Sequence, residues 1–150
     1  MKIYNKRVML NNLGGYAQTI QAKLQDQYST YMAKDELEKV LVEACANENW
    51  NISNSKLMQI ADATYNPTNV DRVQSFVLLK LQAKPVEWRR ILKTMQAIEF
   101  VVKNGSPQAV MAFKRDSYKI SSLCSFSYME NGKDVGKVIR EKTALVCDLL

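Results

Sequence analysis

The stretch PVEWRRILKTMQAIEFVVKNG, residues 85–105, decides the fold class of this 150-residue chain. Its apolar side chains recur three and four positions apart, the period of a helix with one buried face; they are Trp88, Ile91, Leu92, Met95, Ile98 and Val102. Pro85 suits a first helical turn, where its missing amide costs nothing. Gly105 is expected to end the helix in a left-handed conformation. The stretch therefore predicts one long helix with a buried stripe.

The same helical spacing continues on both sides of this helix. It is found in residues 35–45, 57–64, 70–81, 107–113 and 137–149, with one short helix expected in 117–129. Asp35 can cap the first of these helices, and Thr68 or Asn69 can cap the third. Asn66-Pro67 predicts a break and Asn131-Gly132 a turn. No stretch alternates as a strand would, so the sequence predicts an all-α fold of six to eight helices.

Composition excludes several function classes. The chain is 47% hydrophobic and 24% charged, which suits one globular unit, and no apolar run is long enough to span a bilayer. The three cysteines, Cys45, Cys124 and Cys147, are odd in number and far apart, as in a reducing compartment. The absence of histidine removes histidine-based catalytic triads and the common zinc sites that use it. We expect no catalytic residues, no metal site, no cofactor and no enzyme activity.

Residues 1–34 differ from residues 35–150 and are predicted to form a separate basic, amphipathic arm. The arm carries five basic residues against Asp26 alone, which is four of the six net positive charges of the chain. Gly14-Gly15 divides it. Helical spacing places Leu24, Tyr28, Tyr31 and Met32 on one face with Ile20. Such a face packs on the protein body or inserts into a membrane surface, and the pattern alone leaves both readings open.

Three stretches give the chain a resemblance to the epsin N-terminal homology (ENTH) domain family. They are SKLMQIADATYN (55–66), WRRILK (88–93) with FVVKNGS (100–106), and FSYMENGKDVG (126–136) leading into VIREK (138–142). The resemblance implies a right-handed superhelix of seven to eight helices preceded by an amphipathic helical arm. It implies an adaptor module of clathrin-associated vesicle formation that binds phosphoinositide headgroups. Its place would be cytoplasmic and peripheral to membranes, with plasma membrane, Golgi and endosome all left open.

The resemblance also implies where the headgroup would bind. Carried over position by position, the phosphoinositide-binding residues are Asn47, Lys80, Lys84, Arg90 and Lys93, and the membrane-inserting residues are Leu24, Tyr28, Tyr31 and Met32. Several basic side chains must converge on such a headgroup, because one lysine near a membrane surface contributes only about 1 kcal/mol. Arg90 and Lys93 are three positions apart and so share a helix face.

Several family positions that are usually basic are not basic in this chain. Val42 and Val86 stand at two of them, and Gln25, Asp26 and Ser29 are interleaved with the expected insertion face. About half of the family's pocket remains, so the resemblance implies weak headgroup binding. It therefore leaves a second hypothesis open, a module that binds a SNARE or another helical cargo with little or no lipid binding.

The remaining expectations concern other partners and bulky side chains. The resemblance implies clathrin and adaptor motifs in an arm beyond Leu150, in a longer protein. The basic residues form no continuous stripe with stacking aromatics, so we expect no nucleic-acid partner. Without the resemblance, the cluster around Arg89 and Arg90 would be interpreted as a solvated basic face. Trp50 and Trp88 are interpreted as core anchors.

Overall fold

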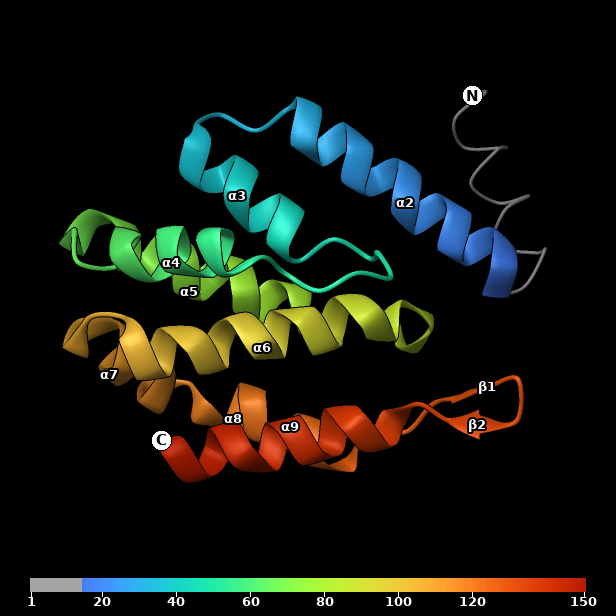
Figure 1. Ribbon diagram of the computed structural model, residues 1–150. Helices are drawn as coiled ribbons and strands as arrows, with labels where there is room; N and C mark the ends of the chain where they lie inside the picture. Colours follow the sequence, from blue (N-terminus) through green and yellow to red (C-terminus); the bar gives the residue numbers. More distant parts are fainter. Residues whose placement is uncertain (1–14) are drawn as a thin grey trace.

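The computed structural model describes residues 15–150 (Figure 1), so the part of the predicted basic arm in residues 1–14 lies outside the described residues. The described chain contains eight α-helices. They are α2 (Gly15–Tyr31), α3 (Glu36–Ala44), α4 (Asn54–Ala63), α5 (Pro67–Lys80), α6 (Trp88–Asn104), α7 (Pro107–Arg115), α8 (Ser117–Ser121) and α9 (Gly136–Leu149). Two 3₁₀ turns, η1 (Pro85–Glu87) and η2 (Ser122–Ser125), precede α6 and follow α8. The predicted all-α fold is confirmed.

Helix α6, which forms most of the stretch 85–105, lies at the centre of the described structure. It runs between α4 and α5 on one side and α9 on the other (Figure 1), and it packs against both α4 and α9. Its Ile91, Met95 and Ile98 are almost completely buried, together with Ile60 of α4 and Ile139 of α9. The core is thus built around the apolar stripe of one helix.

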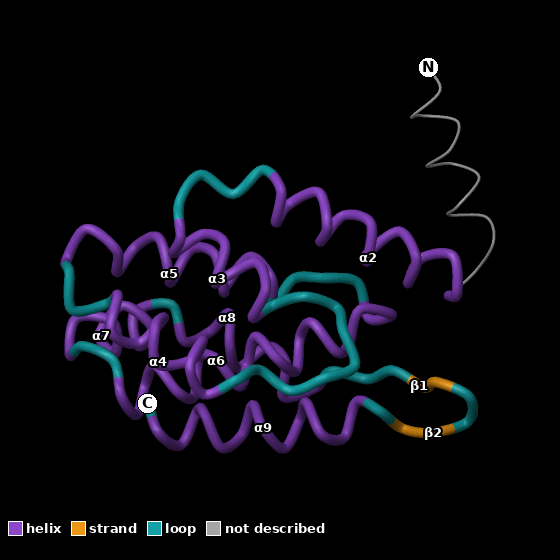
Figure 2. The backbone as a smooth tube through the Cα atoms, turned by 45° about the horizontal axis from the view of Figure 1, so that its top comes forward, coloured by secondary structure: helices purple, strands orange, loops and turns teal. Residues whose placement is uncertain are grey.

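One short pair of strands was not expected from the sequence. Strands β1 (Met129–Glu130) and β2 (Lys133–Asp134) pair antiparallel, and their hairpin projects beyond the helices (Figure 2). Asn131 and Gly132 form its turn with φ of 52° and 76°. Both residues tolerate positive φ, as a two-residue hairpin turn requires. The predicted turn is confirmed, and the flanking strands are too short for an alternating pattern to reveal them.

The helix ends follow local chemistry, with two corrections. Asp35 caps α3, its side chain accepting a hydrogen bond from the Glu38 amide at 2.9 Å. The cap of α5 is Asn66 rather than Thr68 or Asn69, because Pro67 already occupies its first turn. Gly105 follows α6 with φ −83° and ψ −175°, so the predicted left-handed ending is wrong. Glycine is needed there because a Cβ would lie 2.6 Å from the Val101 carbonyl oxygen.

Helix α2 lies on the outside of the helical body in both views (Figure 1 and Figure 2). It packs against α3 and η1. Among residues 16–31, only Ala17, Ala22 and Asp26 are buried. No helix within residues 15–150 is long and apolar enough to cross a bilayer.

Candidate anion-binding site

The first turns of α6 carry three cationic side chains. Pro85 begins η1, and α6 follows directly from Trp88, which fixes the direction of the side chains after it. Arg90 and Lys93, both predicted headgroup residues, are each only 4% exposed. Arg89 is half-buried on a neighbouring part of the helix surface. The two predicted residues share a helix face, and the structure gives their charges very different surroundings.

Arg90 is fully engaged with groups of its own chain. Its Nη1 donates to Asp26 Oδ1 at 2.6 Å and to the Cys45 carbonyl oxygen at 2.9 Å, and its Nε donates to Glu87 Oε1 at 2.9 Å. The second oxygen of Asp26 accepts from the Asn47 backbone N–H at 2.8 Å. Burial alone would lower the pKa of Arg90, but Asp26 and Glu87 more than offset this and raise it.

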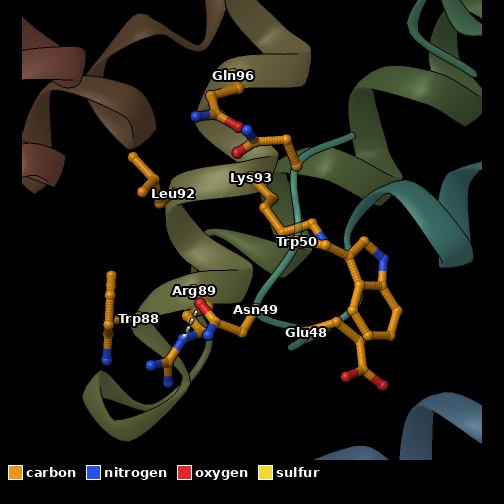
Figure 3. A pocket seen from close by; sticks show the side chains of 9 residues that line it. Glu48, Asn49, Trp50, Trp88, Arg89, Leu92, Lys93 and Gln96 are labelled. Carbon is orange, nitrogen blue, oxygen red and sulfur yellow. Dashed lines mark hydrogen bonds between the residues drawn. The ribbon is translucent and has the colours of Figure 1, made fainter. Parts of the chain in front are cut away.

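Lys93 has no such partner. Among residues 15–150, its Nζ is the one buried side-chain nitrogen or oxygen atom without a hydrogen bond. Burial lowers the pKa of Lys93 below its ordinary value. The ammonium lies 5.7 Å from the centre of the Trp50 ring, toward which the side chain extends from α6 (Figure 3). A cation over an aromatic face gains some electrostatic stabilisation, but this does not replace an anion.

A pocket of about 120 Å³ lies over Lys93. Its walls come from the loop between α3 and α4 and from the first half of α6 (Figure 3). They comprise Glu48, Asn49, Trp50, Asn51, Trp88, Arg89, Leu92, Lys93 and Gln96. Pockets for drug-sized ligands measure about 300–1,000 Å³, so this one suits a single small group. Lys93 and Arg89, together with three side-chain amides, outweigh the single carboxylate of Glu48, so this lining favours a small anion.

Arg89 stands at the rim of this pocket. Its guanidinium lies 4.6 Å from the centre of the Trp88 ring, its Nε donates to Asn49 Oδ1 at 3.3 Å, and it pairs with Glu130 of the hairpin at 3.9 Å. The long contact with Glu130 is partly exposed, and such pairs contribute at most about 1 kcal/mol. The pair with Glu130 therefore does little to hold Arg89 away from an anion in the pocket.

The other predicted headgroup residues lie elsewhere. Lys80, at the end of α5, places its ammonium 5.2 Å from the centre of the Phe76 ring. Lys84 is exposed and lines a separate cleft of about 370 Å³ between α2 and η1. Asn47 is buried beneath α2, where its side-chain oxygen accepts from the Arg90 amide at 3.3 Å. Of the five predicted residues, only Lys93 lines the pocket described above.

Sequence reasoning missed the residues that complete this pocket. Trp50 was interpreted as a core anchor, but its side chain is 63% exposed. Asn49 and Gln96 were not considered. The feature of the sequence that could have indicated an exposed Trp50 was its position in the polar stretch 47–54. This stretch lacks the helical spacing of buried apolar residues. Trp88 is partly buried against the core, as its place in the stripe predicts.

The predicted insertion face of α2 is open to solvent. Leu24, Tyr28, Tyr31 and Met32 are between 48% and 85% exposed, and Ile20 on the same face is 38% exposed. Ala22 and Asp26, on the other side of the helix, are buried, and so is Ala17, which helical spacing places on the stripe of Ile20 and Leu24. From Ile20 onward, the apolar face of the helix is therefore largely exposed within the described chain. Whether this face enters a membrane stays a prediction.

Comparison with known proteins identifies the family. The family described as the ENTH domain matches residues 34–150. The clathrin interactor EPSIN 1 of Arabidopsis thaliana is 36% identical over 116 residues, which are 77% of this chain and 21% of that protein. Human epsin-1 is 33% identical over 109 residues, 72% of this chain and 19% of that protein. The chain thus spans about a fifth of the length of these curated relatives.

Solved structures agree with this result. The ENTH domain of epsin-2 in complex with phosphatidylinositol 4,5-bisphosphate has a TM-score of 0.74 at 26% identity, covering 79% of this chain and 87% of that one. The ENTH domain of human epsinR has a TM-score of 0.72 at 26% identity, covering 77% and 87%. ENTH domains and epsins are non-enzymatic adaptor proteins, as the composition of the chain leads one to expect. The division at residue 34/35 stays a prediction. The chain belongs to the ENTH domain family.

Proposed function

We propose that this domain is a peripheral membrane-adaptor module that binds phosphoinositide headgroups, with one phosphate seated in the pocket over Lys93. Membership of the ENTH family supports this role, as does the epsin-2 relative described in complex with phosphatidylinositol 4,5-bisphosphate. The similarity to a protein named as a clathrin interactor supports a place in clathrin-associated vesicle formation. The compartment is cytoplasmic by the same reasoning.

The observation that carries the proposal is the unpaired ammonium of Lys93. Burying a charge without an opposite charge is unfavourable, and natural interiors rarely retain one that does nothing. A phosphate oxygen would supply the missing acceptor, and charge-assisted bonds of this kind are about twice as strong as neutral ones. Trp50 covers the ammonium from an exposed loop, so that a shift of its indole would admit the phosphate.

The same geometry supports weak rather than tight binding. Arg90 and the Asn47 amide are occupied by Asp26, and Lys80 and Lys84 do not line the pocket. Lys93 and Arg89 are left as the cations that face a headgroup there. The exposed stripe of α2 would add apolar contact with the bilayer, where the Tyr28 and Tyr31 rings suit the headgroup level.

Vesicle co-sedimentation tests the proposal. The vesicles contain phosphatidylcholine with phosphatidylserine, phosphatidylinositol 4-phosphate or phosphatidylinositol 4,5-bisphosphate, adjusted to equal charge. We expect selective pelleting on the phosphoinositide vesicles, lost in Lys93→Glu and retained in Lys114→Glu. The control makes the same charge change at an exposed position on α7, which does not line the pocket. Equal loss in both variants would show that only net charge is sensed.

A second candidate function is binding of a helical protein such as a SNARE. A mostly apolar groove of about 410 Å³ between α5 and α7 favours it, with Met111 69% exposed at its edge. Methionine is adaptable and suits a surface that packs against apolar side chains. If no vesicle pellets the domain, this candidate takes precedence. Substituting Met111 with Ser would then weaken binding to an isolated SNARE helical domain, and Lys93→Glu would not.

A further inference from the structure

An internal anion already occupies two donors of the predicted headgroup site. The Asp26 carboxylate, carried by α2, accepts from Arg90 Nη1 at 2.6 Å and from the Asn47 backbone N–H at 2.8 Å. The side chains of Asp26 and Arg90 are only 9% and 5% exposed. No ligand can reach this guanidinium while α2 lies in place.

These donors suit a phosphate as well as they suit a carboxylate. A guanidinium and a backbone N–H that converge on one point bind either oxyanion, and arginine pairs with both in the same geometry. The phosphate monoester of a phosphoinositide carries about 1.5 to 2 negative charges near neutral pH, more than the single charge of a carboxylate. The two anions would compete for one place.

The ion pair of Asp26 with Arg90 is a buried charged contact between α2 and the body. The other buried side chains among residues 16–31 belong to Ala17 and Ala22, which bury little apolar surface. Part of the boundary between α2 and η1 is an open cleft, in which Lys84 and Glu87 face Gln21 and Gln25. Removal of Asp26 from its site would therefore take away the charged part of this interface and leave α2 held by its packing against α3 and η1.

The geometry points to an autoinhibitory contact: Asp26 substitutes for a phosphate at Arg90 and Asn47, and a phosphoinositide headgroup must displace it, releasing α2. The inference rests on the proposed function and adds its regulation. The released helix carries its exposed apolar stripe, which the bilayer can then accept.

Neutralising Asp26 should strengthen binding of a soluble headgroup. If the open form is about a tenth of the population, apparent affinity is reduced about tenfold, and Asp26→Asn removes most of this reduction. Calorimetric titration with inositol 1,4,5-trisphosphate measures the difference in affinity between the wild type and Asp26→Asn. Asp62→Asn, an equal charge change at an exposed position on α4, is the control. The same titration with phosphatidylinositol 4,5-bisphosphate vesicles separates the lipid from the free phosphate ester.

Amide hydrogen exchange of the wild-type protein is the second measurement, and it does not depend on how well the variant folds. Inositol trisphosphate should speed exchange in residues 15–31 and slow it elsewhere around the site. Tighter binding by Asp26→Asn together with faster exchange in α2 supports the inference. Unchanged or weaker binding by Asp26→Asn, or exchange in α2 that slows with ligand, overturns it.

The design separates the inference from the proposed function. Wild-type binding that depends on Lys93 but is not improved by Asp26→Asn leaves the function standing and overturns the autoinhibitory contact. Absence of binding in both the wild type and Asp26→Asn overturns both. Binding that appears only in Asp26→Asn supports the inference in its strongest form, a site closed until Asp26 is removed.

Discussion

At Lys93 the protein keeps a charge where methionine, of similar length, would pack without one. A buried polar group that lacks a partner costs about 1–3 kcal/mol. We therefore expect Lys93→Met to raise the free energy of unfolding by about this amount, and the melting temperature by a few degrees, while it abolishes headgroup binding. Thermal unfolding in phosphate-free buffer measures the first effect and vesicle pelleting the second. A variant less stable than wild type would contradict the unpaired state of Nζ.

The pH dependence of the stability difference between Lys93→Met and the wild type identifies the cause of that difference. Burial lowers the pKa of Lys93 in the folded protein, while an unfolded lysine titrates near about 10.4. Between these two pKa values the unfolded chain binds more protons at Lys93 than the folded chain does. The contribution of Lys93 to the free energy of unfolding of the wild type therefore rises with pH. The advantage of Lys93→Met should shrink across that window. A difference that is constant with pH would assign the effect to packing instead of charge.

Single residues divide into those that sequence could place and those that it could not. Lys93 was reached through its position in the motif WRRILK, and its burial agrees with the helical stripe. The partner of Arg90 could not be predicted, because Asp26 lies 64 positions away and contacts it only through the docking of α2. Trp50 was misplaced because tryptophan is usually buried, whereas this one closes a pocket from a loop.

Among the elements, helices were predictable and short connections were not. Apolar spacing located α3 to α7 and α9, since each buries one face on the core. Asp35 was a predictable cap because its side chain can accept a hydrogen bond from the first turn. The hairpin of two-residue strands has no periodic pattern to find. Helix α2 docks with a buried ion pair and two small buried alanines rather than with a stripe of large apolar side chains, and for this reason its orientation stayed open.

The exposed face of α2 leads to a prediction at the element scale. Leu24→Ser and Tyr28→Ser should leave thermal stability nearly unchanged, because substitutions at exposed positions usually alter it by less than about 0.5 kcal/mol. If the face enters the bilayer, each should weaken vesicle binding about tenfold, since full burial of such a side chain contributes about 1.5–3 kcal/mol. Titration with vesicles of increasing lipid concentration measures this loss.

Leu145→Ser provides the matched control for this face. Leu145 lies on α9 and is 44% exposed, close to the 48% of Leu24. The same chemical change there should not affect vesicle binding. If Leu145→Ser and Leu24→Ser weaken it equally, or if neither does, α2 has no special role at the membrane.

At the scale of the whole molecule, net charge and a specific site must be told apart. The chain carries six net positive charges, and each basic residue near an anionic membrane contributes about 1 kcal/mol. This attraction is screened over a Debye length of about 10 Å at 0.1 M salt and about 3 Å at 1 M. A phosphate bound at buried Lys93 is screened much less, because low-dielectric protein surrounds it.

Raising the salt concentration should therefore separate the two contributions. Between about 0.1 and 0.5 M sodium chloride, we expect pelleting on phosphatidylserine vesicles to disappear, as the surface attraction is screened. Pelleting on phosphoinositide vesicles should fall only in part, and the part that persists should be the part lost in Lys93→Glu. If wild type and Lys93→Glu lose binding to both vesicles in parallel, membranes attract this domain through its net charge, and the pocket over Lys93 is not a headgroup site.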